Sequence, residues 1–239
     1  MFVTLMYHLV NDEISDSIAV SRRAFEEQMR CLHDEGYHCL TIDEASAAAQ
    51  SISPAPPCSV LITFDDGYAD NVEHALPILT RYGLRATLFV ISATIGQRNR
   101  WNPKACYDTW HLDWKGLRTW LAAGCDSGGH THEHLCMTRL SEDEVRHTVR
   151  VNKEILEHGL GRTLVGFSYP YGMYNALAQR VVAESYSIAF SDTAGVWSPA
   201  ADRYAINRIG VRPEWGVKEF RKRIELTARL AEQGVARRE

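Results

Sequence analysis

The 239-residue sequence has no long apolar run, and no stretch approaches the ~20 residues that a membrane-spanning helix needs. It also lacks an excess of basic side chains, because 26 Lys and Arg stand against 30 Asp and Glu. The resulting net charge of −4 gives no support to nucleic-acid binding. The N-terminus has neither a basic region nor a long enough apolar run for a signal peptide. We therefore expect a cytoplasmic protein, unless a leader has been removed.

The cysteines lack the spacing of a disulfide framework or a metal cluster. No two of them form a CxxC pair, and their separations follow no regular pattern. Such cysteines are typical of reduced thiols inside a folded protein. We expect this of all six: Cys31, Cys39, Cys58, Cys106, Cys125 and Cys136.

The sequence does contain a regular alternation of short apolar segments and amphipathic segments. This alternation predicts a parallel sheet whose strands are joined by helices in right-handed crossovers. No internal repeat or linker divides the chain, so we expect residues 1–239 to form one barrel-like α/β domain. Strands are predicted at 2–7, 59–64, 86–91, 163–169, 187–190 and 205–211, and helices at 22–35, 41–50, 70–82, 114–123, 141–158, 176–184 and from about 217.

The first group of reactive side chains follows the clearest predicted strand. Asp65 and Asp66 end this strand and precede Gly67. Neighbouring strand residues normally point to opposite faces, but at a strand end both carboxylates can turn toward one site. Two such charges repel each other unless a cation or a proton transfer makes use of them. The alternative is an ordinary Asp-Gly turn that caps the next helix.

The second group is a run of three alternating histidines in residues 129–134. His130 and His134 are four residues apart, which on a helical turn would place both rings on one face and direct two nitrogens to one metal. His132 would point elsewhere. Two histidines and one carboxylate, with positions left open for water and substrate, describe a catalytic metal site. Three surface histidines present by chance remain the alternative.

Two weaker motifs also follow predicted strands. Residues 167–172 run from a strand into a Pro-Gly turn, where a backbone N–H could face an oxyanion and Tyr171 could line a pocket. His8 ends the first strand, although a solitary histidine is more often structural. In a parallel barrel the carboxyl ends of all strands lie on one face, where active sites are built. The shared position of these groups favours one functional site over separate coincidences.

These motifs resemble those of the polysaccharide deacetylase family, the NodB-homology group or carbohydrate esterase family four. The resemblance covers about residues 1–212, and its matching segments are Thr63–Gly67, Gly128–Leu135 and Tyr169–Gly172. It implies a distorted (β/α) barrel of seven or eight strands. It also implies roles for individual residues: Asp66, His130 and His134 as metal ligands, Asp65 as general base, and the Tyr171 N–H as oxyanion donor.

The sequence departs from the usual family pattern in two places. It has no late Leu-x-His segment, so it resembles the rearranged branch typified by biofilm poly-N-acetylglucosamine deacetylases, in which a Tyr-His near the N-terminus supplies the general acid. That resemblance makes His8 the acid. The usual Arg-x-Pro motif reads Ser168-Tyr169-Pro170. Arg208 could replace the missing arginine that orients the base, but an ordinary surface salt bridge would explain it equally well.

The resemblance implies a metal-dependent hydrolase that removes an N-acetyl group from a sugar and releases acetate. Zinc is the metal we expect first, with cobalt, nickel and iron also open. We expect a cytosolic substrate, such as a short oligosaccharide, a carrier-linked sugar or an aminoglycoside-type intermediate. Pro170, Tyr171 and Trp101 are expected beside the substrate, the two aromatic rings stacking on sugar rings. The alternatives are a catalytically silent glycan-binding domain and a hydrolase of another amide, such as an N-formyl group.

Overall fold

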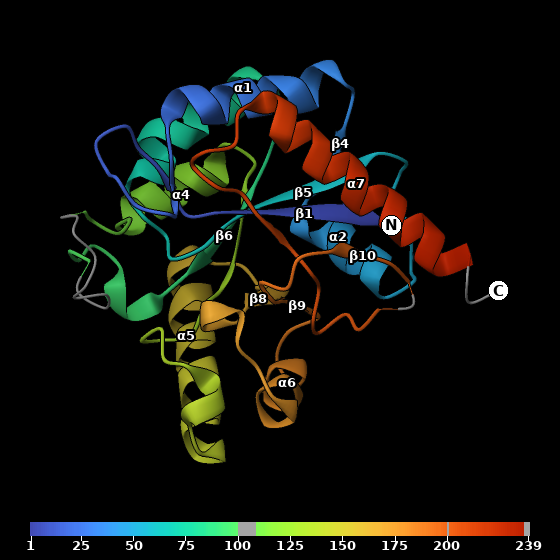
Figure 1. Cartoon of the computed structure of the whole chain (residues 1–239). Coiled ribbons are helices and arrows are strands. Elements are labelled where there is room, and N and C mark those ends of the chain that lie inside the picture. Colours follow the sequence, from blue (N-terminus) through green and yellow to red (C-terminus); the bar gives the residue numbers. More distant parts are fainter. Residues whose placement is uncertain (100–108, 200, 237–239) are drawn as a thin grey trace.

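A curled nine-stranded sheet forms the centre of the computed structural model, which describes residues 1–99, 109–199 and 201–236 (Figure 1). The strand order is β10-β1-β5-β6-β7-β8-β9, with β11 beside β1 and β4 beside β5. Every pair is parallel except β1 with β10. The strands are β1 (Phe2–Tyr7), β4 (His38–Cys39), β5 (Ser59–Phe64), β6 (Thr87–Val90), β7 (Asp126–Gly129), β8 (Gly166–Ser168), β9 (Ile188–Phe190), β10 (Val196–Trp197) and β11 (Ile209–Gly210).

The segment of residues 206–210 connects the two ends of the curled sheet. Ile206 forms a parallel bridge to Phe190 in β9. Three residues later, Ile209 in β11 pairs with Leu5 in β1. The sheet therefore curls into a distorted barrel, which confirms the predicted fold class.

Helices cover the outside of this sheet on two sides (Figure 1). Helices α1, α4 and α7 lie on one side, where α1 packs against α7, and α5 and α6 pack together on the other. None of the described helices is long and apolar enough to cross a membrane. The helices are α1 (Arg22–Asp34), α2 (Ile42–Ala49), α3 (Leu76–Arg81), α4 (Trp114–Ala122), α5 (Glu142–Leu160), α6 (Ala176–Ala183) and α7 (Val217–Ala236).

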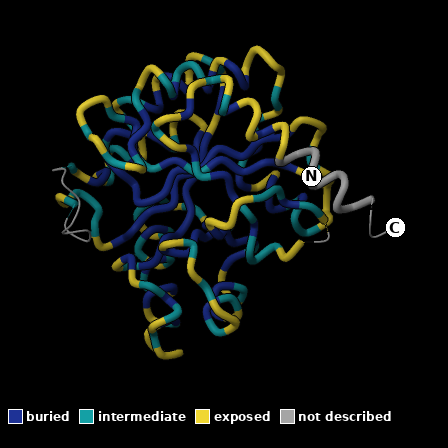
Figure 2. The backbone as a smooth tube through the Cα atoms, in the orientation of Figure 1, coloured by how far each residue is buried: buried dark blue, intermediate teal, exposed yellow. Residues whose placement is uncertain are grey.

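Strand β5 shows how the sheet separates two apolar cores. All six of its residues are buried, as are most strand residues in Figure 2. Its alternate side chains Val60, Ile62 and Phe64 pack in the larger core beneath the helices. Leu61 packs in the smaller cluster that includes Phe89. Because side chains alternate between faces along a strand, residues 63 and 65 continue the face of Leu61 into the barrel.

Side-chain caps begin helices α1, α2 and α5. Ser21 accepts a hydrogen bond from the Ala24 N–H and begins α1. Thr41 begins α2 with a complete capping box, and Ser141 does the same for α5. The helix predicted at 70–82 is less regular, because it begins as a five-residue π-helix, η1 (Asn71–Ala75), and continues as α3.

Strand β7 is the main element that the sequence analysis did not predict. Its four residues are Asp-Ser-Gly-Gly, with none of the β-branched or aromatic side chains that favour strands. Close packing explains the two glycines. A Cβ on Gly128 would lie 2.5 Å from the Phe89 ring, and one on Gly129 would lie 2.2 Å from the Tyr186 hydroxyl. The space around β7 therefore requires a strand without side chains at these positions.

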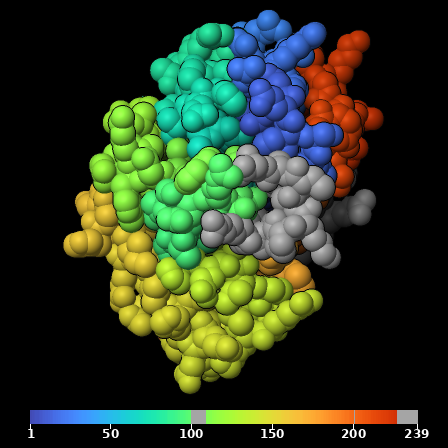
Figure 3. Space-filling view, turned by 90° about the vertical axis from the view of Figure 1, so that its left-hand side faces the viewer, coloured from blue at the N-terminus to red at the C-terminus, as the bar shows by residue number. Residues whose placement is uncertain are grey.

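The carboxyl ends of the parallel strands open on the side that faces left in Figure 1, and Figure 3 looks at that side. There the chain after β6 lies between N-terminal segments above and the residues leading into α5 below. A small parallel pair, β2 (Leu9–Val10) with β3 (Ala19–Val20), follows β1. The five described cysteines are free, but only Cys31 and Cys125 are buried, and Cys58 is exposed, so the expectation of interior thiols is wrong for Cys58. Cys106 lies outside the described residues.

Candidate active site

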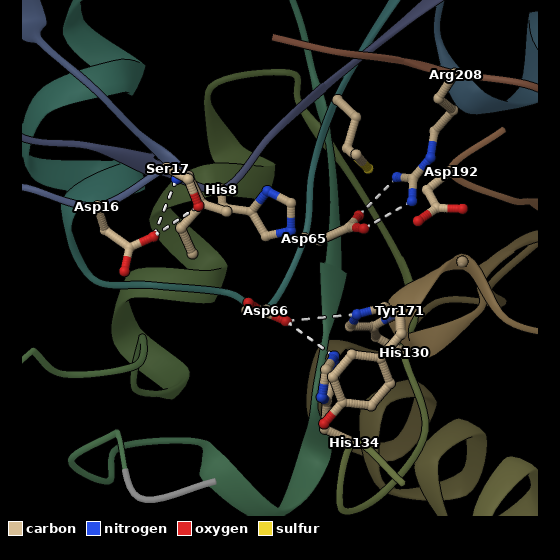
Figure 4. A pocket seen from close by; sticks show the side chains of 13 residues that line it. His8, Asp16, Ser17, Asp65, Asp66, His130, His134, Tyr171, Asp192 and Arg208 are labelled. Atoms are coloured by element: carbon tan, nitrogen blue, oxygen red, sulfur yellow. Dashed lines mark hydrogen bonds and ion pairs between the residues drawn. The ribbon is translucent and has the colours of Figure 1, made fainter. Parts of the chain in front are cut away.

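An open cleft of about 520 Å³ lies at the carboxyl ends of the strands (Figure 4). It gathers side chains from β1, from the loops after β5, β7, β8 and β9, and from the segment that leads into β11. Seven residues singled out from the sequence line it: His8, Asp65, Asp66, His130, His134, Tyr171 and Arg208. The strand topology therefore brings together groups that are up to 200 residues apart, as the parallel arrangement predicts.

Asp66, His130 and His134 form the one group with metal-ligand geometry among the described residues. Their ligand atoms all lie within 4.8 Å of one another, and all three side chains are buried. Asp66 Oδ1 is 3.4 Å from Nε2 of each histidine. This exceeds a good hydrogen bond, but it equals the separation of about 3.4 Å between tetrahedral ligands that are each ~2.1 Å from zinc. The three donors therefore fit a divalent cation.

Each of these three side chains is directed by its local backbone. Asp66 follows β5 with a left-handed φ of 71°, which turns its carboxylate away from the alternation of the strand. His130 follows β7, and its Nδ1 lies 2.7 Å from the Ser168 carbonyl oxygen. A proton on Nδ1 would donate to that carbonyl and leave the Nε2 lone pair facing Asp66. This is the usual outer-sphere arrangement of a metal-binding histidine.

The prediction that His130 and His134 share one face of a helical turn is wrong. Residues 130–134 form a loop, in which Thr131 and His134 adopt left-handed φ values of 62° and 56°. The loop backbone bonds to other elements: the His132 N–H donates to Thr148 Oγ1 in α5, and the His132 carbonyl accepts from the Ala93 N–H. These tertiary bonds replace the helical ones, and the two rings meet through the loop shape. The His132 ring points away, toward the Ser92 hydroxyl at 2.9 Å.

Burial and charge act in opposite directions on the two histidines of the ligand group. Burial opposes protonation of His130, but the carboxylates of Asp65 and Asp66 outweigh it and raise the pKa of His130. Burial lowers the pKa of His134 to about 4, even though Asp66 opposes that shift. His134 is therefore neutral at pH 7 and has a lone pair available for a metal. Burial by itself would raise the pKa of Asp66, but the adjacent histidines outweigh it and hold that pKa below the usual value. An ionised carboxylate and a neutral imidazole are the forms that bind metals.

Asp65 is held by a buried, two-pronged ion pair with Arg208. The two guanidinium nitrogens donate to Asp65 Oδ1 at 2.8 Å and Oδ2 at 2.7 Å. Ser168 Oγ adds a third hydrogen bond to Asp65 Oδ2 at 3.1 Å. Burial opposes ionisation of Asp65, but Arg208 and His130 outweigh it and hold its pKa below the usual value. Asp65 is therefore an ionised carboxylate in one fixed orientation.

Arg208 is a buried residue, so the alternative of a surface salt bridge is wrong. Its side chain is 0% exposed, and its Nε donates to the Ser191 carbonyl at 2.8 Å. It also donates to the hydroxyl of Ser168 at 2.9 Å. Ser168 stands where the usual family motif has arginine, so the guanidinium reaches Asp65 from residue 208 instead.

His8 and Tyr171 lie on opposite sides of the cleft. In Figure 4 the His8 ring points from the end of β1 toward Asp65. Tyr171 lies in a short turn, η4 (Pro170–Gly172), with a left-handed φ of 60°. The Tyr171 ring packs edge-on against the His134 ring, with 4.6 Å between the ring centroids. Tyr171 is nevertheless an exposed residue. Pro170 is buried beneath the turn, and Trp101 lies outside the described residues.

Several residues that line the cleft were not predicted from the sequence. Asp192 follows β9 and lies over the η4 turn, since a Cβ on Gly172 would be 1.9 Å from its Oδ1. Its place at a strand end was the available signal. Asp16 and Ser17 come from the loop between β2 and β3, and strands of two residues leave no recognisable pattern. The other missed residues are Met6, Ile18 and Gly172.

Comparison with known proteins identifies the family. The sequence model of the family described as polysaccharide deacetylase matches residues 53–187. The Bacillus subtilis protein YxkH, which carries a polysaccharide deacetylase name, is 31% identical over 92% of this chain and 75% of its own length. The chain therefore belongs to the polysaccharide deacetylase family. A Staphylococcus aureus poly-beta-1,6-N-acetyl-D-glucosamine N-deacetylase is 24% identical over 85% of this chain and 71% of its own length.

Solved structures show the same fold. The Streptococcus pyogenes deacetylase PplD, in complex with acetate, superposes with a TM-score of 0.83 over 93% of this chain and 97% of its own, at 23% identity. IcaB from Ammonifex degensii superposes with a TM-score of 0.78 over 89% of this chain and 92% of its own, at 26% identity. The distorted barrel is thus shared across nearly the whole length of this chain.

Proposed function

We propose that this protein is a metal-dependent hydrolase that removes the acetyl group from an N-acetylated sugar. One observation carries the proposal: an ionised carboxylate, Asp65, lies beside the three-ligand group of Asp66, His130 and His134 in an open cleft. A metal site that only stabilises the fold is normally closed by four protein ligands. Three ligands and a separate carboxylate suit a site in which water attacks a bound substrate.

We propose zinc as the metal, because two imidazoles and one carboxylate with a spacing of 3.4 Å suit its tetrahedral preference. Cobalt, nickel and iron accept similar donors. Asp66, His130 and His134 would hold the cation through Oδ1 and the two Nε2 atoms. A cation held there would polarise the acetamide carbonyl and make a water molecule more acidic.

Asp65 is the proposed general base. It would take the proton of the attacking water, and its bidentate pair with Arg208 fixes the direction from which it does so. The same pair keeps it ionised, which a base requires, although it also weakens its intrinsic basicity. A water already made acidic needs only a weak base. A positioned general base contributes about 10²–10⁴-fold to a rate.

Tyr171 is proposed to act on the carbonyl oxygen of the amide, and His8 on its nitrogen. The backbone N–H of Tyr171, in the η4 turn, would donate to the carbonyl oxygen as negative charge develops there. His8, which lies across the cleft from Tyr171, would protonate the departing amine. The products are acetate and a free amino sugar.

We propose a short oligosaccharide of N-acetylglucosamine as the substrate to test first. The name of the Staphylococcus aureus relative supports a β-1,6 linkage, and the exposed ring of Tyr171 at the cleft supports binding of a sugar face. Carrier-linked sugars and aminoglycoside-type intermediates are the further candidate substrates to be tested. The cytoplasmic location stays a prediction, and the proposed chemistry does not depend on it.

The zinc-loaded protein would be incubated with N-acetylated mono- and oligosaccharides, nucleotide and other carrier-linked sugars, and aminoglycoside-type intermediates. Mass spectrometry would detect the release of acetate. We expect loss of one or more acetyl groups from at least one sugar, abolished by a chelator and restored by zinc. Asp65→Asn should retain its zinc and lose activity by about 10²–10⁴-fold.

Other outcomes separate the alternatives. Binding of a glycan without any turnover would indicate a glycan-binding domain. Release of formate from N-formyl sugars, without release of acetate, would indicate hydrolysis of a different amide.

A further inference from the structure

The π-helix η1 holds the chain segment that carries His8. Its first residue, Asn71, donates from Nδ2 to the His8 carbonyl oxygen at 2.8 Å. Three residues later, His74 Nδ1 lies 2.8 Å from the Val10 carbonyl oxygen. Two side chains of one helical turn therefore bind the carbonyls of His8 and of Val10, two residues later. The π-helix has a wider turn than an α-helix and is frequent at functional sites.

Backbone hydrogen bonds hold the residues on either side of His8, whereas the His8 carbonyl accepts a hydrogen bond from the Asn71 side chain. The Tyr7 carbonyl accepts from the Asp65 N–H at 3.0 Å, and the Leu9 N–H donates to Ile18 at 3.2 Å. The backbone is thus fixed directly before and after His8. Asn71 supplies the hydrogen bond to the carbonyl between these two anchors, and the segment containing His8 is held on both sides.

Asn71 is itself rigidly placed. It is 0% exposed, and its Nδ2 also lies 3.1 Å from Oδ1 of the buried Asp70. The side-chain amide of Asn71 therefore connects the Asp70 carboxyl group with the His8 backbone. A buried side chain with two acceptors for its two N–H bonds has little freedom to turn. Its position is set by the fold and is independent of any substrate.

We propose that Asn71 is a positioning residue for His8, with His74 as the second support. The proposal rests on the proposed function, in which the His8 ring protonates the departing amine. Proton transfer requires the ring to lie within hydrogen-bond reach of that nitrogen. A displacement of about 1 Å can lower a rate by about 10²-fold. Asn71 and His74 direct the hydrogen bonds described above to the His8 segment and to Asp70, not to the metal-ligand group, so we expect their effect on catalysis to pass through His8.

The test uses the leaving group of the substrate. An amide needs a proton on its departing amine, whereas p-nitrophenyl acetate releases a stable phenolate without one. Asn71→Ala should lower kcat on the N-acetylated sugar by about 10–10²-fold with little change in KM. On p-nitrophenyl acetate its kcat should fall by much less. His8→Ala should show the same pattern with a larger loss on the amide.

Matched variants separate positioning from general damage. Glu73→Ala changes an exposed residue of the same π-helix and should leave both activities near those of the wild type. At the second support, His74→Asn keeps a donor at the place of Nδ1, and His74→Leu removes it. The proposal expects His74→Asn to retain more amide activity than His74→Leu. This pair also serves if Asn71→Ala does not fold.

The outcomes distinguish this proposal from the proposed function. Equal losses on amide and ester, or no loss in Asn71→Ala and His74→Leu, would overturn the positioning role. A wild-type protein that hydrolyses no amide would overturn the proposed function instead. In that case hydrogen exchange still measures whether Asn71 holds the segment around His8. Asn71→Ala should speed exchange at the backbone amides of Leu9 and Asn11 but not at those of β6. Unchanged exchange there would show that Asn71 does not hold the segment.

Discussion

Asp65 and Arg208 are 143 residues apart in the sequence and meet through two parallel hydrogen bonds of 2.8 and 2.7 Å. Both side chains are almost completely buried, at 4% and 0% exposed. A buried charge whose partner is removed is strongly unfavourable, while the pair itself contributes little net stability. The Asp65–Arg208 ion pair therefore orients the Asp65 carboxylate more than it stabilises the fold.

A double-mutant cycle on this pair measures their dependence on each other. Asp65→Asn leaves the Arg208 charge buried and unpaired, and Arg208→Met does the same to Asp65. Each should lower the free energy of unfolding by about 3–5 kcal/mol. The double variant should lose clearly less than the sum, because neither charge is then left alone. Denaturant unfolding in constant excess zinc measures all four proteins, and strict additivity would contradict the pairing.

His134→Ala should weaken metal binding, because it removes one of the three donors that lie within 4.8 Å of each other. We expect the bound zinc to fall well below one per chain when the protein is dialysed against a weak chelator. His132→Ala is the matched control, since this ring lies two residues away and contacts Ser92 instead. Elemental analysis of both variants checks the assignment. Equal zinc contents would remove His134 from the ligand set.

Asp70 should make the protein less stable as the pH rises. Burial raises its pKa to about 8, despite hydrogen bonds from Asn11 and Val10, whereas an unfolded chain has a value of about 3.9. Between these pH values the folded state therefore binds more protons than the unfolded state. The free energy of unfolding then falls with pH, by at most about 1.4 kcal/mol per unit, and levels off above pH 8.

Asp70→Asn keeps the shape of the neutral acid and removes its titration. The variant should be more stable than the wild type at pH 8, and the difference should shrink toward pH 4. Thermal unfolding across this range measures the effect, with the exposed Asp34→Asn as control. A constant difference between variant and wild type at every pH would show that Asp70 does not bind the extra proton.

Gly172→Ala should disturb the turn that carries Tyr171. The added Cβ would lie 1.9 Å from Asp192 Oδ1, at a left-handed φ of 62°. We expect kcat/KM to fall by about 10–10²-fold as the turn and Asp192 move apart. Gly161→Ala is the control, because it has a similar φ of 66° but no atom within 4 Å. It should cost about 1–2 kcal/mol of stability and leave activity unchanged.

A second substitution tests the cause of the Gly172 effect. Asp192→Gly in the Gly172→Ala background removes all three clashing atoms, Oδ1, Cγ and Cβ, and should restore part of the activity. If the two glycine variants lowered activity equally, backbone strain would be sufficient, and the contact with Asp192 would have no role.

Elements that depend on neighbouring residues could be predicted from the sequence. The caps at Ser21, Thr41 and Ser141 fix three helix starts, because side chain and backbone N–H lie within three positions of each other. Strand β5 was readable because all of its residues are apolar or small and buried. The alternation of strands and helices then placed the chemical groups at one end of the barrel.

Other features depend on contacts between residues that are distant in the sequence. Residues 128 and 129 of β7 are glycines because Phe89 and Tyr186 leave no room for a larger side chain there, which no local pattern records. The rings of His130 and His134 meet through a loop held by α5, where the local spacing suggests a helix. Arg208 reaches Asp65 because the segment of residues 206–210 joins the two ends of the sheet. These features depend on residues far apart in the chain, whose mutual packing is fixed only when the barrel closes.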